Sequence, residues 1–314
     1  MDIQALLDRD VVGALARLPP MRLSAANLAA VREARAADWE LFELSDAVER
    51  RDVLVPGAPG EPDVALRIHR PRGVDGALGC IYWMHGGGMV LGRARQDDQR
   101  FDRWCARHRC VGVAVEYRLA PETPYPGPLD DCYAGLGWVA AHADDLGVDA
   151  TRIGLGGVSA GGGLAAGLAL LARDRGEVSV SFQLLVYPMI DDRGVTASSG
   201  WDVPVWPPAS NAFGWSAYLG GRAGVHDVPA YAAPARADDV AGLPEALVVV
   251  GALDGFLDED IAYAQRMMWA GVPVELHVYP GAPHGFDGFA PDAAVARQCR
   301  RDVNGWLARV VASR

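Results

Sequence analysis

The sequence contains no lysine, so all 29 of its basic side chains are arginines. This absence excludes a Walker-type phosphate lysine, the ATP-gripping lysine of protein kinases and any Schiff base formed on lysine. Acidic side chains number 40 and the formal charge is -11, which argues against a nucleic-acid partner because phosphate binding needs a basic face. Any chemistry must therefore come from Ser, Cys, His, Asp, Glu, Tyr or backbone groups.

The first ten residues carry acidic side chains and lack an apolar run, so we expect no secretory signal peptide. The five cysteines are an odd number and lack the spacing of a disulfide framework, which favours free thiols in a reducing cytoplasm. Cys105, His108 and Cys110 lie close together but have neither a fourth ligand nor the spacing of a zinc site. The sequence therefore predicts a cytoplasmic protein without a bound metal.

Residues 154–172 carry no charge and are long enough to span a bilayer. They contain seven glycines, however, and their first half has the pattern of a strand followed by a tight turn. A buried strand–turn–helix explains this segment better than a membrane helix, so we expect no stable membrane anchoring.

Apolar runs alternate with helical patterns along most of the chain. The expected strands are 64–70, 79–84, 111–117, 152–158, 180–187, 246–252 and 274–280, and the expected helices are 97–108, 129–142, 160–174, 258–270 and 292–311. Continuous apolar strands separated by helices are typical of a mainly parallel sheet that is covered on both faces. The sequence therefore predicts an α/β fold.

Two regions depart from this alternation. Residues 1–46 have the pattern of one or two amphipathic helices, and residues 190–230 have no clear period but hold several aromatic residues among Pro, Gly and Ser. A connection as long as 190–230 inside a compact α/β domain is usually functional, for example as a lid. A surface insertion with a small core of its own is the alternative.

The strongest chemical signal is Gly157-Val158-Ser159-Ala160-Gly161, which follows one predicted strand and precedes a helix rich in small residues. A nucleophile at a sharp strand-to-helix turn needs glycine neighbours, because the chain passes very close on both sides. The helix N-terminus also favours the negative charge that develops there. This context predicts that Ser159 is a nucleophile.

The same segment could open a dinucleotide-binding fingerprint, but Ser159 stands where the third glycine belongs. Asp174, at about the distance of the ribose-binding acid, falls on a predicted helix, and several strands precede this one. No nucleotide cofactor is therefore expected.

A second signal, His85-Gly86-Gly87-Gly88, ends the apolar strand before it. Acyl transfer passes through an oxyanion, and successive glycines let backbone amides converge on it without an intervening side chain. A flexible glycine turn would explain the glycines alone, but not together with the nucleophile motif downstream.

His284 lies in a loop after the last predicted strand, and Asp254 directly follows the strand before it. A loop past a strand end is the place from which a histidine can reach the serine. His277 lies within a strand and is interpreted as structural, whereas Asp258 and Glu259 are interpreted as first-turn acids of the next helix. The order Ser159, Asp254, His284 is that of an α/β-hydrolase triad.

With these motifs, the sequence resembles the hormone-sensitive-lipase-like family of α/β-hydrolases, which includes many bacterial carboxylesterases. The resemblance covers about residues 60–290. Its further motifs are Tyr117-Arg118-Leu119-Ala120-Pro121-Glu122 with Pro126 and Asp131, the elbow 157–162, the segment 254–259 and the loop Pro283-His284-Gly285-Phe286. Aspartate commonly stands in the family where this chain has Val158, so the surroundings of Ser159 are expected to be more apolar than usual.

The resemblance implies the α/β-hydrolase fold, with an eight-stranded, mostly parallel sheet, helices on both faces and a helical cap. The cap would consist of about 1–46 and 190–230, and the catalytic core of about 47–189 and 231–314. Oxyanion donors would be the amides of Gly87, Gly88 and Ala160, with Gly86 supporting the turn. We interpret Arg118 and Glu122 as a buried polar brace. The expected apolar substrate pocket consists of Met89, Val90, Val158, Trp206, Phe213 and Trp215.

The predicted function is that of a serine carboxylesterase which forms an acyl-enzyme and acts on short- to medium-chain esters without a cofactor. An amidase or a lactonase would use the same triad, and the residues do not separate these activities. A non-catalytic small-molecule receptor on the same fold is less favoured, because His284 stands in a complete motif. Many members of the family dimerise, but no feature of this sequence requires a homodimer.

Overall fold

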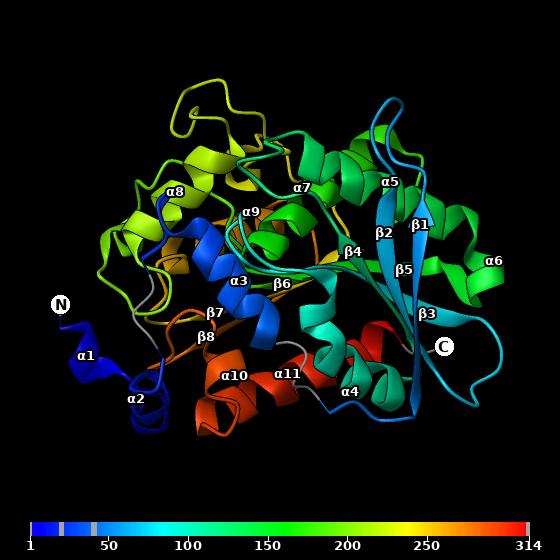
Figure 1. Cartoon of the computed structure of the whole chain (residues 1–314), viewed down its shortest axis with the longest axis horizontal. Coiled ribbons are helices and arrows are strands. Elements are labelled where there is room, and N and C mark those ends of the chain that lie inside the picture. The colour runs from blue at the N-terminus through cyan, green and yellow to red at the C-terminus, as the bar shows by residue number, and fades with distance from the viewer. Residues whose placement is uncertain (1, 19–21, 39–42, 312–314) are drawn as a thin grey trace.

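The computed structural model describes residues 2–18, 22–38 and 43–311. Its centre is one eight-stranded sheet with the spatial order β1-β2-β4-β3-β5-β6-β7-β8 (Figure 1). The strands are β1 (Val48–Val55), β2 (Val64–Pro71), β3 (Leu78–Met84), β4 (Val111–Glu116), β5 (Val148–Val158), β6 (Phe182–Val186), β7 (Glu245–Gly251) and β8 (Val274–Tyr279). The pairings β1–β2 and β2–β4 are antiparallel, and all the others are parallel. The predicted fold class is confirmed.

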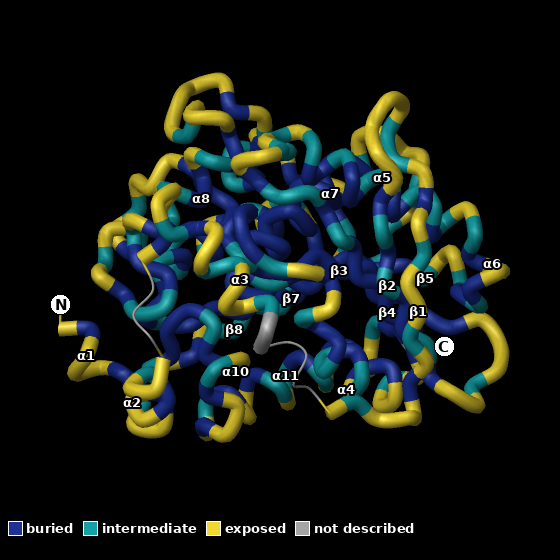
Figure 2. Tube along the Cα trace, viewed as in Figure 1, coloured by how far each residue is buried: buried dark blue, intermediate teal, exposed yellow. Residues whose placement is uncertain are grey.

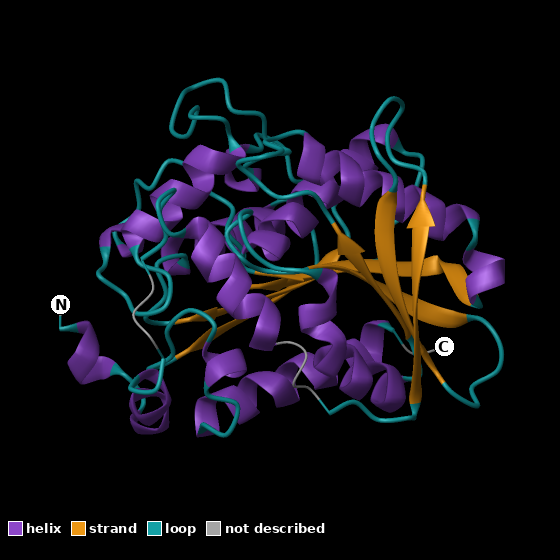
Figure 3. Ribbon diagram, in the orientation of Figure 1, coloured by secondary structure: helices purple, strands orange, loops and turns teal. Residues whose placement is uncertain are grey.

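Helices cover both faces of the sheet (Figure 3). The α-helices are α1 (Ile3–Leu6), α2 (Arg9–Leu15), α3 (Leu28–Asp38), α4 (Asp98–His108), α5 (Gly127–Ala141), α6 (Ala143–Leu146), α7 (Ala160–Arg175), α8 (Pro208–Tyr218), α9 (Leu257–Trp269), α10 (Phe286–Phe289) and α11 (Ala294–Val310). Short 3-10 turns occupy η2 (Ala94–Asp97), η3 (Ser198–Gly200) and η4 (Pro234–Arg236). The helices α5, α7 and α9 lie on one face of the sheet, and α4 and α11 lie on the other.

The core consists of two apolar layers, one on each face, and the alternation of strand side chains separates them. The strands at the centre of the sheet are largely buried (Figure 2). In β3, Tyr82 and Met84 enter the layer with α5 and α7, whereas Ile81 and Trp83 enter the layer with α4 and α11. All seven residues of β3 are buried, which explains its continuous apolar sequence.

The strand β1 is absent from the sequence-based expectation, which contained seven apolar runs. Its sequence Val-Glu-Arg-Arg-Asp-Val-Leu-Val is charged because β1 is an edge strand with much of its surface in water. A pattern of apolar runs does not indicate this strand, because its position at the edge of the sheet depends on tertiary pairing.

The two segments predicted as a cap contact each other and the core. The amide of Leu23 donates to Ser210 Oγ in α8 at 3.0 Å, which joins the N-terminal segment to the 190–230 segment. Arg32 of α3 donates to the carbonyl oxygens of Val90 and Ala120 at 2.8 Å. In contrast, α1 and α2 pack beside β8 and α10, where the amide of Asp8 donates to Gly281 O.

Candidate active site

Ser159 lies between β5 and α7 in a backbone conformation that side chains rarely adopt, with φ 58° and ψ -121°. A Cβ atom at Gly157 would lie 2.1 Å from Gly161 O, and one at Gly161 would lie 2.1 Å from Met84 O. Both glycines of the motif are therefore required by close backbone contacts. The Ser159 amide donates to Val186 O at 2.9 Å, which ties the turn to the end of β6.

His284 connects Ser159 to Asp254. Its Nε2 lies 2.9 Å from Ser159 Oγ, and its Nδ1 lies 2.8 Å from Asp254 Oδ2. A carboxylate can only accept a hydrogen bond, so Nδ1 carries the proton and donates to Asp254. The unprotonated Nε2 can then accept a hydrogen bond from the serine hydroxyl. The structure thus brings together the three residues that the sequence selected from three different strand ends.

Backbone contacts fix the acid and the histidine loop. Asp254 Oδ1 accepts a hydrogen bond from the amide of Phe256 at 3.0 Å, and the amide of Leu253 donates to Ala282 O at 3.0 Å. A Cβ atom at Gly251 would lie 2.2 Å from Ala282 O, so the loops after β7 and β8 touch here. Ser159, Asp254 and His284 are all less than a tenth exposed, so the chain shields the hydrogen-bonded row from water.

The glycine loop after β3 approaches Ser159 closely. A Cβ atom at Gly86 would lie 3.0 Å from Val158 O and 3.5 Å from Ser159 Cβ. Gly87 and Gly88 have φ angles of 132° and 62°, and a Cβ atom at Gly87 would lie 2.1 Å from Leu91 O. The amides of Gly87, Gly88 and Ala160 donate to no acceptor within the described part of the chain, so they are available to a ligand.

His85 anchors the start of this loop. Its Nδ1 donates to Gly86 O at 2.9 Å, its ring stacks on Tyr117 at 4.1 Å, and the Tyr117 hydroxyl donates to His85 O at 2.7 Å. Burial lowers the pKa of His85 to about 4, so the ring is neutral at neutral pH. A Cβ atom at Gly92 would lie 2.3 Å from His85 Nδ1, which leaves the ring in a closely fitted position.

A polar group that sequence reasoning missed lies behind His284. The ring of Tyr187 packs edge-on to His284 with centroids 4.7 Å apart, and its hydroxyl donates to Asp287 Oδ1 at 2.7 Å. Arg100 lies 4.0 Å from Asp287 and donates to Asp97 Oδ1 at 3.0 Å. The position of Tyr187 directly after a strand end is the only signal in the sequence that could have indicated it.

Carboxylates of α9 support the other side of the site. Glu259 Oε1 accepts from the amides of Ile190 and Asp191 at 3.2 Å, and Asp258 accepts from the amide of Ser198 at 2.8 Å. Both acids stand in the first turn of α9, as expected. Burial, with the charge of Asp191 nearby, raises the pKa of Glu259 well above its ordinary value.

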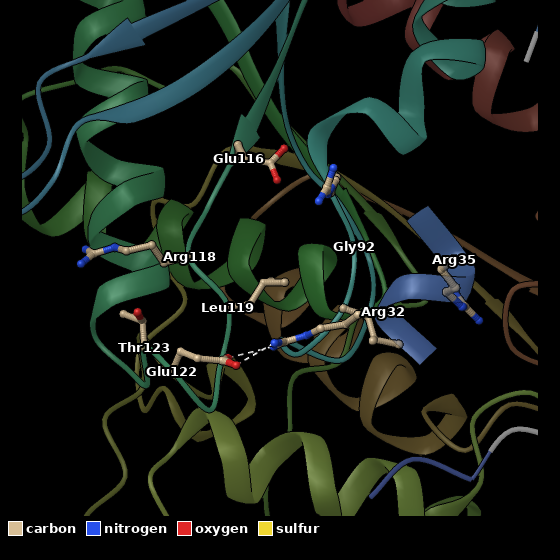
Figure 4. A pocket seen from close by; sticks show the side chains of 10 residues that line it. Arg32, Arg35, Gly92, Glu116, Arg118, Leu119, Glu122 and Thr123 are labelled. Carbon is tan, nitrogen blue, oxygen red and sulfur yellow. Dashed lines mark hydrogen bonds and ion pairs between the residues drawn. The ribbon is translucent and has the colours of Figure 1, made fainter. Parts of the chain in front are cut away.

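The expectation that Arg118 and Glu122 form a buried brace is wrong. Arg118 pairs with Asp131 at 2.7 Å and with Glu61, whereas the exposed Glu122 pairs with Arg32 at 2.7 Å. Each residue therefore binds a different segment, because their side chains leave the loop after β4 in different directions (Figure 4). His277 in β8 contacts Glu275 at 2.7 Å, away from the triad.

The six residues predicted as a substrate pocket divide between the two apolar layers. Met89, Val90, Trp206 and Trp215 are buried in the layer with α7, and the half-buried Phe213 packs against them. Val158 packs against the opposite layer, so the structure does not place it with the other five.

A cavity of about 370 Å³ lies beside this region, between α3 and the loops after β3 and β4 (Figure 4). Its lining includes Arg32, Gly92, Glu116 and Glu122, and no residue of the triad. It is therefore separate from the Ser159–His284–Asp254 row.

Residues 2–18, 22–38 and 43–311 contain neither a candidate metal cluster nor a helix that could cross a membrane. No group of three or more His, Cys, Asp or Glu in these ranges is arranged to hold a metal ion. None of the helices described there has both the length and the hydropathy that a bilayer-crossing segment needs.

The arrangement of nucleophile turn, histidine and acid at the strand ends defines a serine hydrolase. Residues 81–288 match the family model described as alpha/beta hydrolase fold. The chain belongs to this family, within its hormone-sensitive-lipase-like group, and it is a carboxylic ester hydrolase.

The similar proteins carry the same class of name. Esterase LipI from Mycobacterium tuberculosis is 36% identical over 269 residues, covering 78% of this chain and 82% of its own. Carboxylesterase NlhH from the same organism is 37% identical over 259 residues, covering 79% of each. Among solved structures, a bacterial heroin esterase has 40% identity and a TM-score of 0.93, covering 98% of this chain and 99% of its own.

Proposed function

We propose that this enzyme hydrolyses short- to medium-chain carboxylic esters with Ser159 as nucleophile, His284 as general acid–base and Asp254 as its orienting acid. The observation that carries the proposal is the unbroken row of two hydrogen bonds, 2.9 Å and 2.8 Å, that joins these three side chains. The order of the residues and their positions at strand ends support the same assignment.

In the first half of the reaction, Ser159 Oγ attacks the ester carbonyl while His284 Nε2 takes its proton. Asp254 accepts a hydrogen bond from the Nδ1–H group throughout and stabilises the imidazolium that forms. His284 then protonates the leaving alkoxide, and the acyl group stays on Ser159. In the second half, His284 activates a water molecule, which releases the carboxylic acid and returns the serine.

The oxyanion of both steps would be bound by the amides of Gly87, Gly88 and Ala160, with Gly86 as a close backbone support. Two observations support this assignment: these amides have no acceptor among the described residues, and Ala160 is the first residue of α7, whose N-terminus favours negative charge. One such donor typically contributes a factor of about 10² to 10³ in rate.

We assign the cap to about 1–46 and 190–230 and the catalytic core to about 47–189 and 231–314. The contact from Leu23 to Ser210 supports the pairing of the two cap segments, and Met89, Val90, Phe213, Trp206 and Trp215 would give the substrate an apolar surrounding. Val158 would influence the pocket only through the glycine loop, since a Cβ atom at Gly86 would lie 3.2 Å from Val158 Cγ1.

The five cysteines are free and buried, which supports a cytoplasmic location. The ligand of this enzyme would be a small ester molecule. We expect the enzyme to bind no nucleic acid and to have no stable attachment to a membrane. A homodimer is compatible with this mechanism, because one chain supplies the whole triad.

The test is Ser159→Ala, measured with p-nitrophenyl acetate and butyrate. We expect kcat to fall by about 10⁶-fold, because the nucleophile and its base act as a unit. The matched control is Ser181→Ala, which should keep the parent's rate, because Ser181 is a half-buried serine directly before β6, at the opposite end of the sheet. A reactive phosphonate should modify only the peptide that contains Ser159, and an adduct on another peptide would overturn the assignment.

The same acyl-enzyme would serve an amidase or a lactonase. Rates on a matched p-nitrophenyl ester, p-nitroanilide and lactone decide between these activities. We expect the ester to react fastest.

A further inference from the structure

The indole of Trp206 lies directly against the glycine loop. A Cβ atom at Gly88 would lie 2.1 Å from Trp206 Cη2 and 2.4 Å from Cζ2, so only glycine leaves room for the ring at this position. Trp206 is 6% exposed, and it comes from the irregular segment before α8. The ring therefore fills space beside one of the three assigned oxyanion donors.

A second glycine bounds the same ring. Gly214 in α8 has no side chain, and a Cβ atom there would lie 2.7 Å from Gly88 O and 3.5 Å from Trp206 Cζ2. It would also lie 3.5 Å from Met189 Cε. The ring is thus held in a slot between two glycines, one on the glycine loop and one on the cap helix.

Polar contacts fix the orientation of the indole. Its Nε1 donates to Asn211 Oδ1 at 3.2 Å, and the backbone amide of Trp206 donates to Pro204 O at 2.9 Å. The second bond closes a three-residue turn around Val205, whose φ is 72°. A turn of this kind is rare and strained, and a β-branched residue at positive φ is an outlier. Such strain is retained where the surroundings over-determine a position, often at ligand sites.

The slot borders the reacting atoms. The ring of Trp206 lies 6.5 Å from that of His284, inclined by 37°, and a Cβ atom at Gly285 would lie 3.9 Å from Val205 Cγ1. Val205 and Trp206 therefore cover the histidine loop on one side and the glycine loop on the other. A substrate chain extending from Ser159 in this direction would meet the indole.

We propose that Trp206 is a specificity-determining residue, which limits the length of the ester chain that fits beside Ser159 and thereby excludes long-chain fatty esters. This inference rests on the proposed function, because it concerns substrates of the same Ser159. The two glycines make room for the ring, and Asn211 and the turn at Val205 hold it in place.

The experiment measures kcat/KM for p-nitrophenyl esters from two to sixteen carbons and for a series of alkyl acetates, using the parent and Trp206→Ala. The parent should lose rate as one chain lengthens. In Trp206→Ala, each further methylene group buried in the freed space should raise kcat/KM by about fourfold. The ratio of the decyl or decanoyl ester to the shortest ester should therefore rise at least tenfold. The series that responds identifies whether the acyl or the alcohol chain lies against Trp206.

Trp201→Ala is the matched control, because Trp201 lies in the same segment and packs against the opposite apolar layer. It should keep the parent's chain-length profile. Trp206→Phe retains an aromatic ring and should give a smaller shift in the same direction if Trp206→Ala fails to fold.

Three results would overturn the proposal: a parent that cleaves long esters as fast as acetate, folded Trp206 variants with the parent's profile, or an equal loss on every ester. These results differ from failure of the proposed function, in which the parent cleaves no ester and takes up no phosphonate at Ser159.

Discussion

The hydroxyl group of Tyr187 donates a hydrogen bond to Asp287 Oδ1 at 2.7 Å, and its ring packs edge-on against His284 with the centroids 4.7 Å apart. His284 lies in the histidine loop and Asp287 in the short helix α10 that follows it, so the tyrosine contacts both the loop and the helix. Arg100 of α4 lies 4.0 Å from Asp287. Its guanidinium also lies over the rings of Trp83 and Trp104, at 5.0 and 5.3 Å from their centroids. The groups behind the histidine therefore come from the end of β6 and from the helices α10 and α4.

Tyr187→Phe removes one of the two contacts and keeps the other. We expect kcat on p-nitrophenyl acetate to fall several-fold with little change in KM, because the histidine loop loses a tether and the substrate surroundings stay the same. The free energy of unfolding should fall by about 1 to 2 kcal/mol. Tyr231→Phe is the control, since its hydroxyl donates to the exposed Asp174 at the same 2.7 Å, and its kcat should equal the parent's. Equal kcat losses in the two variants would contradict a positioning role for Tyr187.

Arg32→Ala tests how α3 is attached to the core. The guanidinium binds the carboxylate of Glu122 (Figure 4). It also donates to the carbonyl oxygens of Val90 and Ala120. The variant should lose about 2 to 3 kcal/mol of stability, because it removes hydrogen bonds from a charged donor. The value of kcat/KM should also fall, because Val90 lies only two residues after Gly88.

Glu122→Gln is the comparison for Arg32→Ala. The Glu122 side chain is 62% exposed, so its ion pair with Arg32 should contribute less than about 1 kcal/mol. Thermal denaturation and ester kinetics on both variants check the difference. A loss in Glu122→Gln as large as that in Arg32→Ala would show that the ion pair, rather than the two carbonyl contacts, attaches α3.

Asp260 is a buried carboxyl group in α9 whose two oxygens have no hydrogen-bond partner among the described residues. Burial raises its pKa well above the ordinary 3.8, and the charges of Glu259 and Asp254 raise it further. A raised pKa in the folded state means that the native protein binds a proton more tightly than the unfolded chain. The contribution of Asp260 to stability is then fully present below pH 3.8 and declines as the pH rises toward the folded-state pKa of this group.

Asp260→Asn should therefore stabilise the protein at neutral pH and weaken the decline of stability above about pH 4. Urea denaturation between pH 4 and 8 measures the effect. Asp149→Asn should act in the opposite sense, because hydrogen bonds from Thr151 and Arg152 lower the pKa of Asp149 to about 2. A destabilised Asp260→Asn at pH 7 would mean that the carboxylate has a favourable role in the native protein.

The sequence predicts the strand ends well because the site depends on local signals. Apolar runs place Ser159, Asp254 and His284 at the same edge of a parallel sheet, and the structure joins them with hydrogen bonds. Two of the motif glycines also have a local explanation, since a side chain at Gly157 or Gly87 would meet a backbone oxygen four residues further along the chain.

What the sequence does not reveal depends on contacts between distant segments. The charged, solvent-facing residues of β1 hide this strand, and Arg118 and Glu122 belong to one motif but pair with Asp131 and Arg32. The slot for Trp206 requires Gly88 and Gly214, which are far apart in the chain and come together only through the packing of α8 on the glycine loop. No periodicity or spacing rule encodes such a meeting.

All five cysteines are buried, and they are distributed over both faces of the sheet: Cys80 and Cys132 lie in one apolar layer, and Cys105, Cys110 and Cys299 lie in the other. A thiol reagent can react with them only when the layer that covers them opens. The rate at which each cysteine is alkylated under native conditions therefore reports local opening of the layer around it. The order in which the five thiols react would show which of the two apolar layers opens first.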